Sequence, residues 1–303
     1  MNKSLVEASV QASPLTTCKR ELHSINQDNG HHSWSVLKHL YQRDLDTLGT
    51  RYACLLLNIS DHSHDKFHRH KHIWNRANFK VAVDGSANYL FKRHILHEAD
   101  VISGDFDSID AKLIERLQSP RKALKQAPVA GKKDGEQTPS VPKMPQLVET
   151  PCQKETDFTK AIRVVQGFKP DIQYFFALYH SDGSRLDHIF GIVNTLHIIK
   201  KDIFLLNVQS NTLSWLLQSG NHTILKPQGQ ELCSLVPFTG PTEVRTQGLR
   251  YNLHTTSTMS FGGMISTSNF CHNQKDRILV DTNRELLWSI DIEDQNKQSH
   301  QRV

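Results

Sequence analysis

Aspartates at the ends of apolar segments are the residues of this sequence best suited to chemistry. Asp105 and Asp107 follow the apolar run "VISG" and are separated by one residue. At ~5 Å and an effective dielectric of ~20 their carboxylates repel by ~3 kcal/mol, which a bound cation would offset. Oxygen ligands at the carboxyl end of a parallel strand suit Mg²⁺ that bridges to phosphates. Taken alone, the pair is better explained as an Asp-rich turn in which Asp107 or Ser108 caps the next helix.

A second motif, "ETDFTKAI", opens an amphipathic helix. Capping explains Thr156 and Asp157 at its start. It does not explain Lys160, because the helix dipole disfavours a positive charge in the first turn unless an anion lies nearby. A bound phosphate would account for all three residues.

Two further loops follow apolar runs. In "YHSDGSRLDHIF", Arg185 can grip a phosphate with two hydrogen bonds, and Asp187 is either a cap or a metal or base group. In "VAVDGSANYLF", Asp84, Gly85 and Asn88 form a sharp turn that a ligand can approach closely. Loops that follow parallel strands meet at one sheet edge, so these four motifs predict one shared site.

The elements that must position these loops are short apolar runs that alternate with amphipathic helical patterns. The runs occupy residues 52–59, 79–84, 99–105, 172–179 and 202–208. They lack the alternation of half-exposed strands, so we interpret them as buried parallel strands. Apolar residues at helical spacing over 158–165 and 189–196 predict crossover helices, and hence an open α/β sheet.

The chain divides into several parts that differ in residue composition and in hydrophobic pattern. Residues 1–33 are polar and predict a disordered extension, and residues 34–210 form the α/β domain. Residues 119–155, rich in proline and lysine, predict a disordered insertion within that domain. From residue 211 to 303 short strand-like stretches broken by Gly, Pro and Asn predict a smaller all-β domain.

Composition excludes several classes. The net charge of +5 is compatible with anionic ligands and too weak to indicate nucleic acid. Five scattered cysteines, no apolar leader and no apolar run of membrane-spanning length predict a soluble, cytoplasmic protein. The histidine-rich stretch 62–72 matches no folded zinc site, and we interpret it as a solvated loop.

Together these motifs resemble the thiamine pyrophosphokinase (thiamin diphosphokinase) family. "DGSAN", "GDFDSI", "TDFTKAI" and "GSRLDH" occur in that family's order. "GLRYNL" (248–253) and "FGGMISTSN" (261–269) look like its thiamine-side segments. The resemblance covers roughly residues 50–290 without the insertion. It implies an α/β domain followed by a β-sandwich, and a homodimer whose active sites lie between the α/β domain of one subunit and the β-sandwich of the other.

The resemblance also implies an activity, the transfer of pyrophosphate from ATP to the thiamine hydroxyl, which gives thiamine diphosphate and AMP. Its implied metal ligands for Mg²⁺ are Asp105, Asp107 and Asp157. Lys160 and Arg185 would stabilise phosphate charge, and Asp187 would orient the site or accept the hydroxyl proton. The positions implied to contact ATP are Asn58, Asp84, Gly85, Ser86, Asn88, Ser108, Thr156, Gly183 and Ser184. Those implied to contact thiamine are Tyr251, Ser266, Ser268 and Asn269.

Several positions depart from the family pattern and keep alternatives open. Ser86 and Ser184 stand where glycine is common, and Tyr89 stands where arginine is usual. Tyr251 replaces a thiamine-stacking tryptophan, which predicts weaker thiamine binding. One alternative is therefore a degenerate paralogue that binds thiamine or nucleotide without turnover. Another is a glycosyltransferase that uses the Asp-x-Asp pair for a metal-bound nucleotide sugar, but this leaves the other motifs unexplained.

Overall fold

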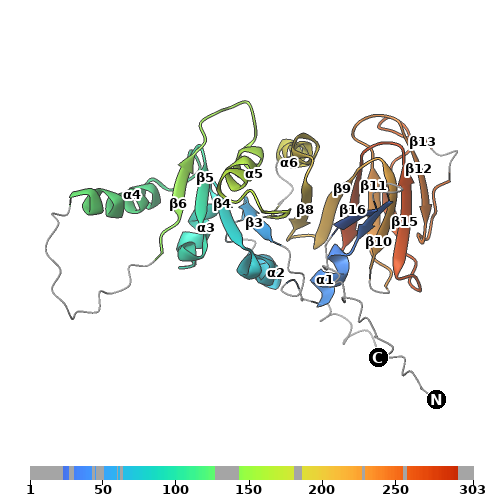
Figure 1. The fold of residues 1–303 in the computed structure, drawn as a ribbon, viewed down its shortest axis with the longest axis horizontal. Coiled ribbons are helices and arrows are strands. Elements are labelled where there is room, and N and C mark those ends of the chain that lie inside the picture. The colour runs from blue at the N-terminus through green and yellow to red at the C-terminus, as the bar shows by residue number, and fades with distance from the viewer. Residues whose placement is uncertain are drawn as a thin grey trace, which may run out of the picture.

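The protein is built around two β-sheets, one of which carries helices on both faces (Figure 1). The computed structural model describes residues 23–26, 31–42, 45, 51–59, 61, 64–126, 143–180, 186–226, 229–254 and 258–292. Within these residues no helix is both long and apolar enough to span a membrane.

Six parallel strands form the first half of a ten-stranded sheet, in the order β8-β7-β3-β4-β5-β6. They are β3 (Tyr52–Leu57), β4 (Phe79–Val83), β5 (Val101–Gly104), β6 (Gln146–Glu149), β7 (Tyr174–Tyr179) and β8 (Asp202–Asn207). All six residues of β3 are buried, because helices cover both faces of the sheet. Alternate residues of one strand therefore enter two separate cores, as Leu55 and Leu56 do.

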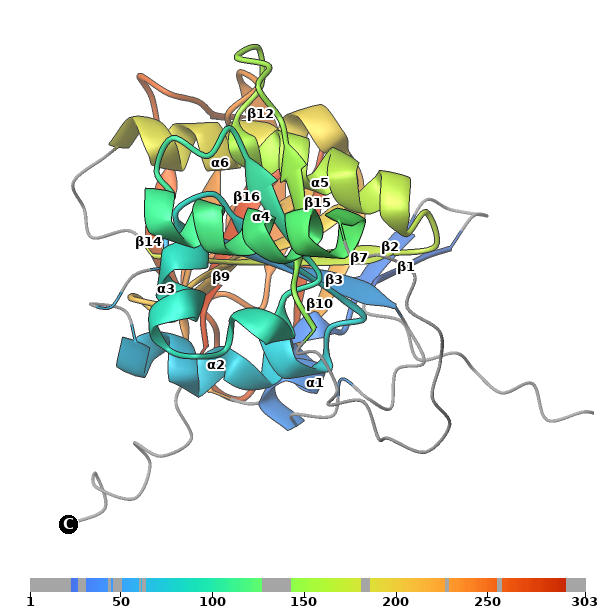
Figure 2. The same cartoon turned by 90° about the vertical axis from the view of Figure 1, so that its left-hand side faces the viewer.

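The helices lie in two layers (Figure 2). They are α1 (Val36–Gln42), α2 (His64–Arg76), α3 (Ser86–Lys92), η3 (Leu96–Glu98), α4 (Ala111–Gln126), α5 (Asp157–Phe168) and α6 (Leu186–Ile199). Helices α5 and α6 bury Phe158, Ile162 and Leu196 against one face. Helices α1 to α4 cover the other face, where Trp74 and Leu113 join the larger core.

The second half of the same sheet is antiparallel and forms a sandwich with the other sheet. The added strands are β9 (Thr212–Leu217), β16 (Leu286–Asp291), β11 (Leu232–Val236) and β14 (Ser266–Phe270). The facing sheet has the order β1 (His23–Asn26), β2 (His31–Trp34), β10 (Gly220–Leu225), β15 (Arg277–Thr282), β12 (Thr242–Gln247) and β13 (Thr258–Met259). Residues of β12 and β15 alternate between buried and exposed, as a sheet with one solvated face requires. The predicted fold class, α/β followed by a β-sandwich, is confirmed.

Three parts of the sequence prediction differ from the structure. The expected disordered extension over 1–33 contains β1 and the first three residues of β2, which pairs in parallel with β10. Polar composition hid these strands because β1 pairs with β2, and β2 is held in the sheet by β10, about 190 residues further along the chain. The histidine-rich stretch expected to be a loop instead contains most of α2, which buries Phe67, His70, Ile73 and Trp74.

The predicted disordered insertion 119–155 is partly ordered. Helix α4 extends into it as far as Gln126, and β6 adds a sixth parallel strand at the sheet edge. Residues 127–142 lie outside the described residues. At the expected boundary near residue 210, β8 and β9 pair antiparallel, so the sheet runs on from one unit into the next. The division at 210/211 stays a prediction.

Candidate functional site

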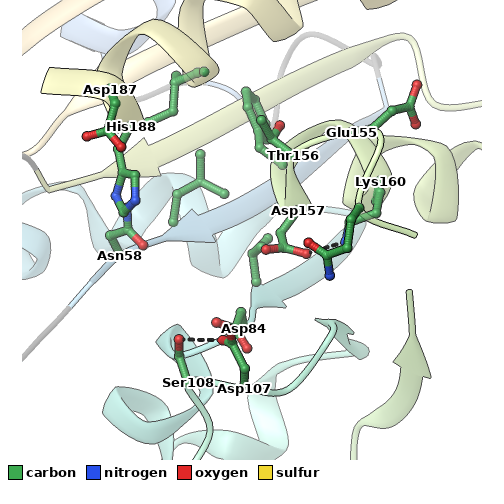
Figure 3. Close-up of a pocket in the computed structure, with 16 residues that line it drawn as sticks. Asn58, Asp84, Asp107, Ser108, Glu155, Thr156, Asp157, Lys160, Asp187 and His188 are labelled. Carbon is green, nitrogen blue, oxygen red and sulfur yellow. Dashed lines mark hydrogen bonds and ion pairs between the residues drawn. The ribbon is translucent and has the colours of Figure 1, made fainter. Parts of the chain in front are cut away.

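A cleft of about 600 Å³ opens at the carboxyl ends of β3, β4 and β5 (Figure 3). Its other wall is made by the first turns of α5 and α6, which pack against each other. Eight predicted site residues line it: Asn58, Asp84, Asp107, Ser108, Thr156, Asp157, Lys160 and Asp187. The four loops expected to meet at one sheet edge are thus represented in one cleft.

Three aspartates form a carboxylate cluster at the edge of this cleft: Asp84 after β4, and Asp105 and Asp107 after β5. Asp84 and Asp107 line the cleft, and Asp105 lies beside them without lining it. One oxygen of each lies within 4.8 Å of the others. Gly104 permits this approach, because a Cβ there would lie 3.0 Å from the Cβ of Asp84. Two residues adopt left-handed backbone to turn the loops, Asp84 at φ 46° and Phe106 at φ 68°.

The negative charges of the carboxylate cluster are not offset within the cluster. Burial raises the pKa of Asp84, and the negative charges of Asp107 and Asp157 raise it further, against hydrogen bonds that lower it. Asp84 Oδ1 is buried without a hydrogen-bond partner. The pKa of Asp105 is lowered, chiefly by the hydrogen bond that Gln153 Nε2 donates to its Oδ2 at 3.0 Å. A buried orphan oxygen beside two further carboxylates fits a hard divalent cation.

The first turn of α5 places a positively charged side chain, Lys160, on the wall opposite the carboxylate cluster. Thr156 caps the helix by accepting a hydrogen bond from Thr159 N at 3.2 Å. Lys160 Nζ lies 2.7 Å from Asp157 Oδ1 and donates to Thr150 O at 2.7 Å, with 6% of the residue exposed. Asp157 therefore pairs with Lys160 and is not part of the carboxylate cluster, in which Asp84 stands instead. The role of Asp157 as a metal ligand stays a prediction.

Asn58 after β3, and Asp187 and His188 in the first turn of α6, complete the polar lining of the cleft. Asn58 has left-handed backbone, φ 54°, at the end of β3. In Figure 3 the His188 imidazole points toward Asn58 from the first turn of α6. The predicted residues Gly183, Ser184 and Arg185 lie outside the described residues.

Two predicted contacts in "DGSAN", Ser86 and Asn88, hold neighbouring loops and do not line the cleft. Asn88 Nδ2 donates to Ser108 O at 2.8 Å, and its Oδ1 accepts from Asp110 N at 2.9 Å. Ser86 is 1% exposed, and its Oγ accepts from Ile59 N at 3.3 Å. Gly85 caps α3 at φ −53°, so neither it nor helical Ser86 needs left-handed backbone. The serine at position 86 is thus accommodated without strain.

Tyr89, the other departure in this loop, is absorbed by the core. It is 2% exposed, its ring packs edge-on against Phe67, and its hydroxyl is 2.8 Å from His64 Nδ1. The histidine-rich helix α2 is therefore the structural partner of a residue that stands where the family usually has arginine.

Three polar cleft residues were missed by sequence reasoning: Gln153, Glu155 and His188. Gln153 and Glu155 fell within the stretch interpreted as a disordered insertion. Glu155 is held by Arg163, whose Nη2 and Nε donate to its carboxylate at 2.6 and 2.9 Å. His188 is the last residue of the motif "GSRLDH", and its place in that motif was the signal that could have found it.

The four residues expected to contact thiamine lie on the sandwich and do not line the cleft. Tyr251 is 59% exposed on a loop after β12. Asn269 is buried and braces that loop, because its Oδ1 accepts from Tyr251 N and its Nδ2 donates to Tyr251 O at 2.8 Å. Ser266 and Ser268 precede it on β14. The side-chain amide of Asn269 thus holds Tyr251 in place.

Fold and cleft define a two-part protein in which a parallel α/β sheet with a carboxylate-rich cleft continues into a β-sandwich. The sequence model of the thiamin pyrophosphokinase catalytic domain matches residues 70–206, and that of the thiamin pyrophosphokinase vitamin B1 binding domain matches residues 221–287. The chain belongs to the thiamin pyrophosphokinase family.

Curated relatives and solved structures agree with this assignment. Thiamine pyrophosphokinase 3 of Oryza sativa subsp. japonica is 26% identical over 265 residues, covering 80% of this chain and 88% of its own. Thiamine pyrophosphokinase 1 of Arabidopsis thaliana is 25% identical, covering 82% and 89%. The thiamin pyrophosphokinase structure from Candida albicans superposes with a TM-score of 0.63 at 17% identity, covering 91% of this chain and 97% of that one. At that identity the superposition supports the fold alone.

Proposed function

We propose that this protein is a thiamine diphosphokinase, which transfers the pyrophosphoryl group of ATP to the hydroxyl of thiamine. The observation that carries the proposal is the carboxylate cluster facing Lys160 across one cleft, in a chain that matches both the catalytic and the vitamin B1 binding domains of its family. A glycosyltransferase built on the Asp-x-Asp pair would leave both matches unexplained.

The reaction needs positioning and charge stabilisation more than covalent chemistry. The thiamine hydroxyl oxygen attacks the β-phosphorus of ATP, the bond from that phosphorus to the α,β-bridging oxygen breaks, and AMP leaves. The products are thiamine diphosphate, AMP and the hydroxyl proton. Asp187 on the α6 wall is the group we assign to orient the hydroxyl or accept this proton.

Mg²⁺ is the cofactor we propose, since the carboxylate cluster offers only hard oxygen ligands. Asp84, Asp105 and Asp107 would hold it, with Asp157 as a further candidate. A bound Mg²⁺ would neutralise phosphate charge and offset the repulsion among the carboxylates. Lys160 would add a fixed positive charge from the opposite wall.

The other ATP contacts follow from the cleft. Asn58, Ser108 and Thr156 line it, while Asn88 and Ser86 hydrogen-bond to the loops after β5 and β3, and Gly85 caps α3. Gly183, Ser184 and Arg185 remain proposed contacts from the sequence resemblance. A cytoplasmic location likewise remains a prediction from the sequence.

Thiamine is proposed to bind between two subunits. None of its four predicted contacts lines the cleft of the same chain, so a second chain would supply them. Tyr251, with 59% of its surface exposed, would cover the cationic thiazolium ring. A homodimer with two shared active sites follows from this arrangement.

Turnover is the direct test of the proposed function. Purified protein with ATP, Mg²⁺ and thiamine should yield AMP and thiamine diphosphate in equal amounts. Asp105→Asn keeps the side-chain shape and should lower kcat by about 100-fold or more. The matched control is Asp276→Asn, a side chain 63% exposed beside Arg277, which should retain the wild-type rate. Absence of both products with the wild-type protein across thiamine concentrations would refute the function, and binding without turnover would identify a degenerate paralogue.

Subunit mixing tests the shared site. Asp105→Asn and Tyr251→Ala subunits should each be impaired alone. Random mixing puts one intact site in every mixed dimer, so activity should recover to about a quarter of wild type. Recovery that does not exceed the sum of the two variants would place the whole site within one chain.

A further inference from the structure

Three threonine hydroxyls form a buried chain between α5 and α6. Thr156 Oγ1 lies 3.0 Å from Thr159 Oγ1, and Thr159 Oγ1 lies 2.9 Å from Thr195 Oγ1. Thr195 Oγ1 in turn donates to Gly191 O at 3.0 Å. Thr159 and Thr195 are completely buried and do not line the cleft.

One direction among these hydroxyls is fixed by its acceptor. A carbonyl oxygen only accepts, so the Thr195 proton goes to Gly191 O. Thr195 Oγ1 is then an acceptor for Thr159 at 2.9 Å and for Thr156 at 3.3 Å, and either Thr156 or Thr159 can donate to the other. Thr156 Oγ1 also accepts from Thr159 N. Each hydroxyl proton is used once, so substituting one member leaves buried polar groups unpaired.

The hydroxyl chain joins the two helices whose first turns form one wall of the cleft. Asp187, Gly191 and Thr195 are spaced by four residues and share one face of α6. On that face Gly191 lets Thr156 approach closely, because a Cβ there would lie 3.3 Å from Thr156 Cγ2. On α5, Thr159 directly precedes Lys160. The spacing from Lys160 to Asp187 along this wall therefore depends on this contact.

We propose that Thr159 and Thr195 are positioning residues for pyrophosphoryl transfer. Their hydroxyls set the first turn of α5 against α6, so that Lys160 and Asp157 are held at a fixed distance from Asp187. This inference rests on the proposed function. Hydrogen bonds depend on direction, so they fix the relative placement of two helices more closely than apolar packing does. Displacements near 1 Å in an active site cost up to about 100-fold in rate.

Thr195→Val tests the proposal because it removes the hydroxyl and nearly preserves the shape. We expect kcat to fall about 10-fold while the KM for thiamine changes less than about 2-fold, since thiamine binding does not involve this contact. Thr195→Ser restores the hydroxyl and should return kcat to within about 2-fold of wild type. The matched control is Thr242→Val in β12, a completely buried threonine that also donates to a carbonyl, that of Gly240. It should lower stability without lowering kcat.

Amide hydrogen exchange gives a readout that does not need turnover. The amides of Thr159 and Lys160, bonded to Thr156 Oγ1 and Thr156 O, should exchange about 10-fold faster in Thr195→Val and at the wild-type rate in Thr195→Ser and Thr242→Val. Thr159→Val, which removes the middle hydroxyl, should behave like Thr195→Val. Rates are normalised to the folded fraction.

Two results would overturn the proposal: wild-type kcat in folded Thr195→Val, or a loss in Thr195→Ser as large as that in Thr195→Val. If the wild-type protein transfers no pyrophosphoryl group, the proposed function fails. The exchange rates then decide the positioning role alone, and unchanged exchange in both valine variants would refute it.

Discussion

The carboxylate cluster of the cleft and a histidine cluster of the sandwich bury ionizable groups in opposite ways. The histidine cluster comprises His23, His32 and His222 with Trp34 and Asp202. His23 lies 2.9 Å from Asp202 Oδ2 and 3.0 Å from His32 Nδ1. Trp34 Nε1 donates to His222 Nδ1 at 3.0 Å. In the carboxylate cluster, by contrast, a buried oxygen of Asp84 has no hydrogen-bond partner.

Protonation separates the two clusters further. Burial lowers the pKa of His222 to about 3, helped by neighbouring histidines, and its Nε2 lies 2.8 Å from Gln218 O. With Nδ1 accepting from Trp34, the neutral ring is hydrogen-bonded at both nitrogens. The pKa of His32 is lowered by burial and by His23, although Asp202 opposes this. The comparison teaches that the sandwich neutralises its buried groups, whereas the cleft keeps like charges together that need an external partner.

The largest effect should come from Asp84→Asn. Removing one charge from the carboxylate cluster should lower kcat by about 100-fold or more, because the cation loses a ligand. The same change should raise the melting temperature measured without metal, since it relieves repulsion from Asp107. Scanning calorimetry with EDTA and with Mg²⁺ checks this. If Asp84→Asn melted at a lower temperature than wild type in EDTA, the carboxylate cluster would stabilise the fold without metal. The contrast with the histidine cluster would then be lost.

The second-largest effect should come from acid, which should reduce the contribution of the histidine cluster to the free energy of unfolding. The unfolded chain binds a proton at His222 near its ordinary pKa of 6.5, while the folded protein does so only near 3. Stability from this group is therefore complete above about pH 7 and lost as pH falls below 6.5, by about 2 kcal/mol at pH 5. Urea unfolding at pH 8, 6 and 5 measures the loss. His222→Ala should flatten this dependence, and exposed His97→Ala should leave it unchanged.

Trp34→Phe should have a smaller effect. It removes the donor to His222 Nδ1 while keeping an aromatic ring against His23, so unfolding should become easier by about 1–2 kcal/mol. The kcat should stay within about 2-fold of wild type, because no residue of the histidine cluster lines the cleft. A large fall in kcat without unfolding would show that the two clusters are coupled.

The smallest effect should come from Asn88→Ala. It removes the side-chain bonds to Ser108 O and Asp110 N that hold the loop after β5. Both bonds are exposed, so we expect only about a 3-fold rise in the Mg²⁺ concentration that half-saturates the rate. Metal titrations of the variant and wild type measure this shift. An unchanged midpoint would mean that the carboxylate cluster positions itself without this support.

Sequence patterns predicted five of the six parallel strands and the meeting of their polar loops, because both depend on local periodicity and strand direction. They failed where long-range pairing overrides composition, as in β1 and β2, which are polar yet lie in the sandwich. They also failed for α2, whose many histidines obscured the spacing of Phe67, His70, Ile73 and Trp74. Gln153 was missed because the residues that precede it have a linker-like composition.

The sequence by itself determined the family, the order of the motifs and the types of side chain in the cleft, since these depend on residue identity and spacing alone. Only the tertiary structure decided which carboxylates lie together: Asp84 joins Asp105 and Asp107, while Asp157 pairs with Lys160. It also decided that Asn88 and Asn269 brace loops and that Thr159 meets Thr195. The physical reason is that strand pairing and helix packing set distances of a few ångströms between residues far apart in the chain, and charge repulsion and hydrogen bonding act at those distances.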